Sequence, residues 1–328
     1  MFNALVLNQD ENKKTTATIE QLSTSDLPDE DVLVKVDYSS LNYKDGLAVT
    51  GKGKIIRNFP MVPGIDMVGT VEESADSRYS PGDKVVLTGW GVGENYWGGF
   101  SQYAKLKADW LVPLPEGMDP IRTMQIGTAG LTAMLCVMSL EEGGVTPESG
   151  PIVVSGAAGG VGSVAVSILS GLGYSVHAIT GRPETEGYLK ALGAAEILSR
   201  DEMSVPPRPL EKQKWAGAVD TVGDNILARI LAEADYNGVV TACGLAAGFK
   251  LPSTVMPFIL RNVRLQGVDS VMCPYAKRQI AWQRLMTQLP EGALGDIAQL
   301  IALAEVPEYA EKITNGQVQG RVVIDLNA

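Results

Sequence analysis

A glycine-rich turn at residues 155–162 is the strongest chemical signal in this sequence. The apolar run 152–154 leads directly into this turn, a pattern typical of a strand that enters a helix. Glycine lets backbone N–H groups approach phosphate oxygens closely, and the positive end of a helix dipole favours an anion. The spacing Ala157-x-Gly159-x-x-Gly162 therefore predicts a pyrophosphate site, with a glycine-rich helix start that binds no ligand as the alternative.

The residues after the second predicted strand indicate which dinucleotide binds. NAD-binding units usually place an Asp or Glu there for the ribose 2′-hydroxyl, whereas this chain has Thr180-Gly181-Arg182. A guanidinium group pairs well with a 2′-phosphate, and Arg200 follows the third predicted strand, where it could join the same pocket. We therefore expect NADPH rather than NADH as the cofactor, with a solvated surface charge as the alternative for each arginine.

Scarce cysteine and histidine residues exclude several kinds of chemistry. Cys136, Cys243 and Cys273 lie far apart in the sequence, and His177 is the single histidine. A catalytic zinc ion normally takes three protein ligands from Cys, His or carboxylate side chains, so we expect no metal. His177 lies in a predicted buried strand, where a structural role is expected, and nothing supports a Ser–His or Cys–His nucleophile.

The elements that would position these residues alternate between strand and helix. This pattern predicts a parallel sheet with right-handed crossovers, here a doubly wound Rossmann unit of six strands over residues 125–268. Ligands bind such sheets beyond the carboxyl ends of the strands. The expected strands after the first, at 152–154, are 174–180, 196–199, 218–222, 238–243 and 264–268, and the expected helices are 161–172, 184–192, 225–235 and 254–261.

The N-terminal part of the chain has a different pattern. Short alternating runs at 32–36, 67–71 and 84–87 are separated by proline and glycine turns, which predicts a compact, mostly antiparallel β domain. A strand at 321–326 has no partner left in the nucleotide unit, so we expect the chain to return to the first domain. The predicted division is a catalytic domain of residues 1–124 and 269–328 around an NADPH-binding domain of residues 125–268.

Length, composition and charge fit a two-domain enzyme. The chain has 328 residues, too many for one ordinary core, and 45% of them are apolar. We expect no apolar run of membrane-spanning length and no signal peptide, because charged residues are frequent in the first twenty positions. A net charge of −11 argues against nucleic acid as a partner. Without a cysteine pair for a disulfide, a cytoplasmic location is expected.

Several longer motifs resemble the zinc-free quinone-reductase branch of the medium-chain dehydrogenase/reductase superfamily. Residues 51–60 and 87–95 narrow the resemblance to the NADPH-dependent acrylyl-CoA reductases, and it covers essentially the whole chain. The resemblance implies a GroES-like β-rich catalytic domain beside the Rossmann domain. Asp66 stands where zinc-containing members have a Gly-His-Glu zinc signature. The other motifs are residues 42–45, 63–66, 81–85 and 127–133, together with the glycine turn.

This resemblance implies NADPH-dependent reduction of the C2–C3 double bond of acryloyl-CoA to propanoyl-CoA. Hydride adds to the β carbon, negative charge builds on the thioester oxygen, and the α carbon takes a proton. Orientation, enolate stabilisation and proton delivery remain open for each catalytic candidate, Tyr43 could instead pack on the nicotinamide, and ordinary turn chemistry is the alternative. The catalytic candidates are Asn42, Tyr43, Lys44, Asp45 and Asp66.

The resemblance also implies a set of ligand contacts. A basic loop with Lys52, Lys54 and Arg57 could meet CoA phosphates in this acidic protein, with a solvated loop as the alternative. The implied cofactor contacts are Tyr43, Ala158, Gly159, Gly160, Val161, Thr180, Gly181, Arg182, Arg200, Leu245, Ser270 and Asn315, to which Arg321 is added.

Two alternatives to acryloyl-CoA reduction follow from the same fold. Quinone or general enone reduction would use the same hydride chemistry, in an apolar planar slot without a CoA-binding patch. A non-enzymatic NADPH sensor or structural protein would keep the dinucleotide fold without the chemistry, which a polar cleft around Asn42 and Asp66 argues against. The strand at residues 264–272 lies where related enzymes pair their sheets across a dimer, so a homodimer is expected.

Overall fold

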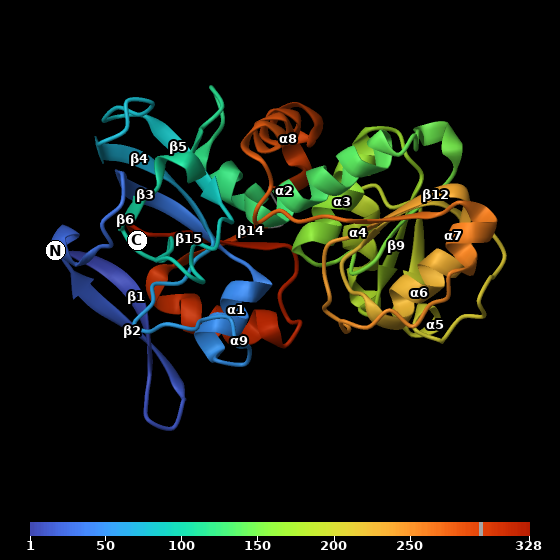
Figure 1. The fold of residues 1–328 in the computed structure, drawn as a ribbon, viewed down its shortest axis with the longest axis horizontal. Helices are drawn as coiled ribbons and strands as arrows, with labels where there is room; N and C mark the ends of the chain where they lie inside the picture. The colour runs from blue at the N-terminus through green and yellow to red at the C-terminus, as the bar shows by residue number, and fades with distance from the viewer. Residues whose placement is uncertain (295–297) are drawn as a thin grey trace. The chain divides into compact units, whose positions relative to one another are not determined.

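The computed structural model describes residues 1–294 and 298–328, and the chain divides into two compact units. Unit 1 contains Met1–Thr128, Val271–Gln279 and Asp296–Ala328, and unit 2 contains Ala129–Ser270 and Ile280–Gly295. The segment Ile280–Gly295 thus belongs to unit 2, whereas the sequence assigned all of 269–328 to the first domain. Figure 1 follows the chain from the blue strands of unit 1 through green and yellow unit 2 to the red C-terminal elements.

Unit 1 is built on a mostly antiparallel sheet, as the alternating runs predicted. Its described strands follow the order β14-β15-β3-β4-β5-β7, with β6 also paired to β3, and only the β14–β15 pair is parallel. Figure 1 shows red β15 beside blue β3, so the chain does return to its first domain. The strands are β3 (Val32–Leu41), β4 (Asp66–Ser74), β5 (Lys84–Thr88), β6 (Tyr103–Leu106), β7 (Val112–Pro113), β14 (Ala298–Ala302) and β15 (Arg321–Asp325), and the separate hairpin is β1 (Phe2–Gln9) with β2 (Thr15–Leu22).

Helix α1 (Tyr43–Thr50) packs against α9 (Val306–Thr314) beside this sheet. It begins where Asp45 accepts a hydrogen bond from the backbone N–H of Asn42, and it ends at Gly51 in the left-handed conformation, with φ 68°. The start of the helix thereby fixes the predicted catalytic run 42–45. The short 3₁₀ helices of unit 1 are η1 (Thr24–Asp26), η2 (Ala108–Trp110) and η6 (Leu303–Glu305).

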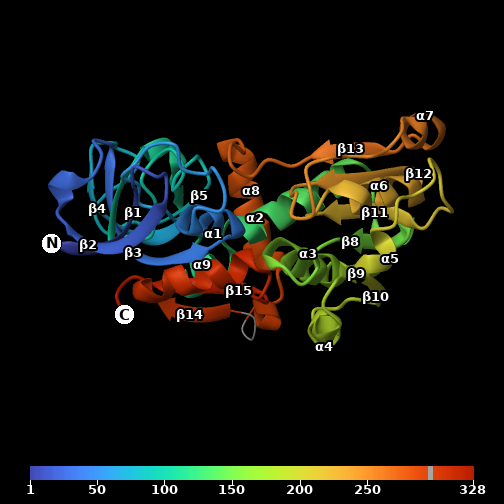
Figure 2. The same cartoon turned by 90° about the horizontal axis from the view of Figure 1, so that it is seen from below.

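Unit 2 contains the predicted doubly wound sheet. Its six described strands are all parallel and follow the order β10-β9-β8-β11-β12-β13, the order 3-2-1-4-5-6 of a Rossmann fold. Figure 2 shows them succeeding one another from β10 to β13. The strands are β8 (Ile152–Val154), β9 (Val176–Thr180), β10 (Glu196–Ser199), β11 (Trp215–Asp220), β12 (Ala234–Ala242) and β13 (Arg264–Gly267).

The helices of unit 2 lie between these strands in the sequence. The predicted helix 184–192 is split into the 3₁₀ turn η4 (Pro183–Thr185) and α4 (Glu186–Ala191), because Thr185 bonds back to the carbonyl oxygen of Arg182. The other helices are α3 (Gly160–Gly171), α5 (Arg200–Met203), α6 (Asp224–Glu233), α7 (Met256–Arg261), η3 (Pro147–Ser149) and η5 (Glu291–Leu294), and α8 (Tyr275–Gln288) has residues in both units.

Helix α2 (Pro120–Glu142) runs from unit 1 into unit 2. It has 23 residues, and its most apolar window has a mean hydropathy of 1.4, so its length and composition would suffice to cross a membrane. The expectation that no apolar run reaches this length was therefore wrong. Because 83% of that window is buried inside the structure, the helix has the burial typical of a core helix. Its regular geometry is interrupted at Gly127, with φ 50° and ψ −157°.

Candidate active site

The predicted phosphate turn joins β8 to α3 in unit 2. Gly159 caps the start of α3, and the backbone N–H of Ala157 donates to the carbonyl oxygen of Ile179 at 3.1 Å. A Cβ on Gly162 would collide with the carbonyl oxygen of Gly156, and Gly156 itself has φ 57°. Only glycine fits both positions without strain, so the turn brings backbone close to backbone as a pyrophosphate cradle requires.

The buried carboxylate of Asp220 accepts a hydrogen bond from Ser155, the residue that begins this turn. Ser155 Oγ donates to Asp220 Oδ1 at 2.7 Å, and the backbone N–H of Gly223 donates to Asp220 Oδ2 at 2.8 Å. Thr221 Oγ1 donates to the carbonyl oxygen of Ser155 at 3.0 Å. Burial raises the pKa of Asp220, partly offset by these hydrogen bonds. The bonds tie the carboxyl ends of β8 and β11 together at the switch point of the sheet. Sequence reasoning missed Ser155, which directly follows the predicted strand 152–154, and Asp220, which lies within the predicted strand 218–222 and ends β11.

The predicted specificity pocket follows β9 and β10. Thr180 and Ser199 are partners in the parallel ladder, so the next residues, Gly181 and Arg200, emerge side by side. Arg182 Nη2 donates to the carbonyl oxygen of Ala158 at 3.1 Å, which links this pocket to the phosphate turn. The described structure therefore brings the arginines predicted for the 2′-phosphate to the same edge as the turn.

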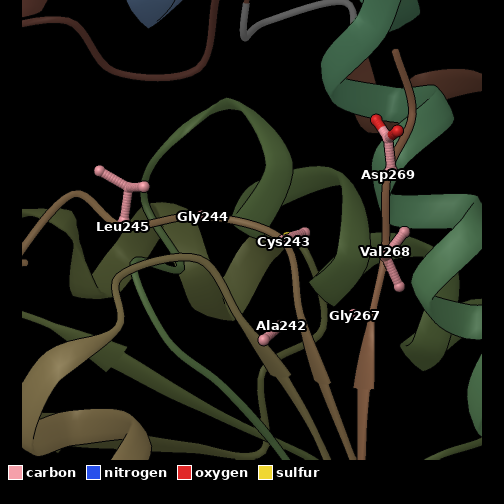
Figure 3. A pocket seen from close by; sticks show the side chains of 7 residues that line it. All are labelled: Ala242, Cys243, Gly244, Leu245, Gly267, Val268 and Asp269. Carbon is pink, nitrogen blue, oxygen red and sulfur yellow. The ribbon is translucent and has the colours of Figure 1, made fainter. Parts of the chain in front are cut away.

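A recess of about 500 Å³ lies beyond the carboxyl ends of β12 and β13 (Figure 3). Figure 3 shows Cys243 following one strand, Val268 and Asp269 following the other, and the Leu245 side chain further along its loop. The predicted contact Leu245 is 64% exposed there. Ser270 comes directly after the lining residue Asp269 and accepts a hydrogen bond from Thr132 Oγ1 at 2.8 Å. The seven lining residues are Ala242, Cys243, Gly244, Leu245, Gly267, Val268 and Asp269.

Asp66 is the centre of a buried polar network in unit 1. Its side chain is fully buried at the first position of β4. Oδ2 accepts hydrogen bonds from Ser40 Oγ at 2.6 Å, Asn42 Nδ2 at 2.8 Å and the backbone N–H of Thr128 at 2.9 Å. Oδ1 accepts one from Thr128 Oγ1 at 2.5 Å. Every one of these bonds is accepted by the carboxylate, so Asp66 is held by donors on several sides.

Gly127 makes the contact between α2 and Asp66 possible. A Cβ at this position would lie 2.5 Å from Asp66 Oδ2, 2.7 Å from Arg321 Nη2 and 2.8 Å from Ser40 Oγ. Its positive φ also interrupts the helix, which restarts at Thr128, and the backbone N–H of Thr128 donates to the carboxylate of Asp66. This contact gives a physical reason for the glycine in the motif 127–133.

Arg321, at the start of β15, completes the network. Its side chain is 3% exposed, and its Nη2 lies 3.8 Å from Asp66 Oδ2. Nη1 donates to Asn42 Oδ1 at 3.1 Å, Nη2 to Ser40 Oγ at 2.9 Å, and Nε to the carbonyl oxygen of Gln125 at 2.9 Å. Burial lowers the pKa of Arg321, and the nearby carboxylates oppose this shift. The sequence suggested Arg321 as a cofactor contact, whereas here it holds Asn42 and Asp66.

The remaining catalytic candidates differ in the hydrogen bonds and ion pairs that they form with other protein groups. Asp45 is buried and accepts hydrogen bonds from the backbone N–H groups of Asn42 and Ile65 at 2.9 and 3.0 Å. Burial raises its pKa to about 7. Lys44 forms a partly buried ion pair with Glu94 at 3.0 Å. Tyr43 is 46% exposed, and its hydroxyl makes no hydrogen bond to another residue in the described part of the chain.

The predicted CoA loop and the last cofactor candidate meet in unit 1. Lys52 Nζ lies 2.5 Å from Glu311 Oε2 and donates to Thr314 Oγ1 at 3.0 Å and to Asn315 Oδ1 at 3.4 Å. Asn315, the residue that ends α9, is thus a partner of Lys52. Lys54 and Arg57 are exposed in the same loop.

The described residues contain no group of three His, Cys, Asp or Glu side chains that could hold a metal ion. His177 is mostly buried in β9, where its ring meets the edge of Trp215 with centroids 5.3 Å apart. His177 therefore lies in the strand that the sequence predicted for it.

Two family profiles match the chain. The alcohol dehydrogenase GroES-like domain matches residues 28–116, and the zinc-binding dehydrogenase family matches residues 160–287. The chain is 60% identical to the probable acrylyl-CoA reductase AcuI of Escherichia coli K12, over 99% of this chain and 100% of that protein. It is 56% identical to the acrylyl-CoA reductase AcuI of Ruegeria pomeroyi over the full length of both.

A solved structure agrees with these relatives. The crystal structure of E. coli K-12 YhdH with bound NADPH superposes with a TM-score of 0.97 at 60% identity, over 99% of this chain and 100% of that chain. Both domain types expected from the sequence are therefore present. The chain belongs to the acrylyl-CoA reductase family of the medium-chain dehydrogenase/reductase superfamily.

Proposed function

We propose that this protein uses NADPH to reduce the C2–C3 double bond of acryloyl-CoA to propanoyl-CoA. The observation that carries the proposal is the carboxyl edge of the unit 2 sheet, which bears a phosphate turn, an arginine pocket and a recess. The substrate follows from the relatives named acrylyl-CoA reductase, which match essentially the whole chain.

The residues of unit 2 fit NADPH on chemical grounds. The glycine turn exposes backbone N–H groups at the start of α3 for the pyrophosphate. Arg182 and Arg200 would hold the 2′-phosphate, and the end of β9 carries no carboxylate that would repel it. Leu245 and Ser270, at the recess and directly after it, would hold the nicotinamide end. Ala158, Gly159, Gly160, Val161, Thr180 and Gly181 complete the proposed cofactor contacts.

Unit 1 would orient the substrate and complete the reaction. Bound NADPH supplies the hydride that adds to the β carbon of the enoyl thioester. Asn42 already bonds Asp66 and Arg321 through its amide, so we assign these three residues to positioning. The hydroxyl of Tyr43, a residue that is 46% exposed, is the group we propose to face the reacting atoms, for enolate stabilisation or proton delivery. Lys44 is a second candidate, and Asp45 holds the start of α1.

The same proposal includes a homodimer. The edge strand β13 has no partner on its outer side among the described strands. Phe249, Val255 and Ile259, which lie between β12 and β13 in the sequence, are 83%, 64% and 71% exposed, and exposed large apolar side chains are typical of surfaces that bind another protein. Sedimentation measurements would test this pairing. We further propose a cytoplasmic location, no membrane or nucleic-acid partner, and the domain division 1–124 with 269–328 around 125–268, in which residues 280–294 of the return segment pack with unit 2.

The direct test compares two substrates. NADPH oxidation should be fast with acryloyl-CoA and slow with a simple quinone, because a quinone offers no CoA moiety to bind. Oxidation that depends on the quinone and is indifferent to acryloyl-CoA would refute the proposal and support general quinone or enone reduction. Loss of neither NADPH nor substrate would favour a protein that binds the dinucleotide without chemistry.

The contribution of the basic loop can be tested separately. Removing Lys54 and Arg57 together by alanine substitution should raise the KM for acryloyl-CoA several-fold, and more strongly at low salt, where charges are least screened. Lys52→Ala is the matched control, since Lys52 is already paired with Glu311. Equal effects of both changes would show that the loop does not contact CoA specifically.

A further inference from the structure

Gly181 occupies a tightly constrained position in the specificity pocket. It directly follows β9, beside Arg200, which directly follows β10. A Cβ on Gly181 would overlap the Cζ, Nε and Nη1 atoms of Arg200. The Arg200 guanidinium group therefore lies where any larger residue at position 181 would place its own side chain.

The two arginines of the pocket are held in different ways. Arg182 donates from Nη2 to the carbonyl oxygen of Ala158 at 3.1 Å, so it is tied to the phosphate turn. Arg200 is 57% exposed, and its ion contact to Asp201 is 3.6 Å long. A long, exposed side chain has many rotamers, and a weak ion pair does not select one of them. The open space over Gly181 is thus the feature that admits Arg200 to the end of β9.

We infer that Gly181 determines cofactor specificity by admitting the Arg200 guanidinium to the backbone at the end of β9, where it meets the 2′-phosphate of NADPH. This inference rests on the proposed NADPH dependence. It assigns to Gly181 an action through Arg200 rather than a direct contact with the phosphate. NADPH binding is favoured because position 181 carries no carboxylate. The absence of any Cβ is a stricter requirement, because every residue other than glycine would displace the Arg200 guanidinium.

The variant Gly181→Ala is expected to fold. Gly181 does not have a positive φ, so alanine fits the backbone. The atoms that a Cβ would meet belong to the end of a flexible side chain, which can move away. Gly187→Ala is the matched control, because a Cβ at Gly187, in α4 of the same unit, meets no atom within 4 Å.

Fluorescence titrations with NADPH and NADH should be made on the wild type, both glycine variants, Arg200→Ala and the double variant Gly181→Ala/Arg200→Ala. We expect Gly181→Ala to weaken NADPH about tenfold and NADH by less than about twofold, as loss of one charge-assisted contact would. Arg200→Ala should show the same losses, and the double variant should bind NADPH no more weakly than Arg200→Ala alone. Gly187→Ala should bind like the wild type.

Three results would overturn the inference: unchanged NADPH affinity in Gly181→Ala, equal losses for NADPH and NADH, or a full additional loss when Gly181→Ala is added to Arg200→Ala. The last result would mean that Gly181 acts on the phosphate itself. A wild-type protein without a preference for NADPH would overturn both this inference and the cofactor assignment. A wild type that prefers NADPH but does not reduce acryloyl-CoA would refute the proposed substrate, while the titrations would still decide the role of Gly181.

Discussion

The candidate cofactor site of unit 2 and the Asp66 network of unit 1 differ in how far their charged groups are already paired within the protein. In unit 2, the phosphate turn uses the backbone of consecutive residues 156–162, and Arg200 remains 57% exposed. In unit 1, Asp66 is fully buried and receives hydrogen bonds from residues 40, 42 and 128, with Arg321 beside it. The Arg200 side chain of the first site can therefore bind a ligand phosphate, whereas the Asp66 carboxylate of the second is already paired with protein groups. Substitutions of the arginines at the carboxyl edge of the unit 2 sheet should therefore change cofactor affinity, and substitutions in the Asp66 network of unit 1 should change stability.

Asp66→Ala should have the largest effect on folding. It leaves the buried Arg321 without its carboxylate and removes the acceptor of Ser40, Asn42 and Thr128. Loss of one member of a buried pair costs about 3–5 kcal/mol of unfolding free energy. Urea unfolding measures this cost. A variant as stable as the wild type would mean that the network does not hold unit 1 together, and the contrast between the units would fail.

Arg182→Ala should change the affinity for NADPH strongly and the unfolding free energy only slightly. Loss of a charge-assisted contact should weaken NADPH about 10- to 100-fold and leave NADH nearly unchanged, because NADH has no 2′-phosphate. The unfolding free energy should change by less than about 1 kcal/mol, since the Arg182 side chain is only partly buried and the bond it donates to the carbonyl oxygen of Ala158 is a hydrogen bond of ordinary strength. Arg208→Ala, which removes an exposed partner of Glu211 in the same unit, is the control. Equal losses for the two cofactors would contradict the 2′-phosphate assignment.

Asp45 should make the unfolding free energy of the protein depend on pH, because it is a buried carboxyl group of unit 1. Its pKa is raised to about 7 by burial, so the folded protein keeps this proton up to about pH 7, while the unfolded chain releases it near pH 4. The folded state binds more protons between these values, and Asp45 therefore lowers stability as the pH rises through this window. The expected contribution is on the order of 1–3 kcal/mol, and Asp45→Asn should remove it.

Urea unfolding at about pH 5 and about pH 7.5 measures the Asp45 contribution as the difference between the two proteins. An Asp45→Asn variant with the same pH dependence as the wild type would show that this carboxyl group titrates normally.

The same contrast explains what could be predicted from the sequence. The strands of unit 2 and the turn at 155–162 depend on neighbouring residues, so hydrophobic pattern and glycine spacing located them, and the alternation of strands and helices predicted the parallel, doubly wound sheet. The return of 321–326 to the first domain followed because no nucleotide-domain strand remained to pair with it.

The network around Asp66 could be predicted only in part. Asn42 and Asp66 came from motifs, but Ser40, Thr128 and Arg321 were not expected to meet them. These residues are far apart in the sequence, and no spacing rule links them. The backbone N–H of Thr128 reaches Asp66 where Gly127 interrupts helix α2, and no sequence pattern predicted that interruption. Such contacts depend on tertiary folding, which local patterns do not encode.

The central claim is hydride transfer from NADPH to the β carbon of acryloyl-CoA, and isotope labelling tests it most directly. NADPH that carries deuterium at the reactive C4 position should yield propanoyl-CoA with one deuterium at C3 and a solvent-derived hydrogen at C2, as measured by mass spectrometry and NMR. Formation of no labelled propanoyl-CoA, together with reduction of a quinone by the same protein, would contradict the account.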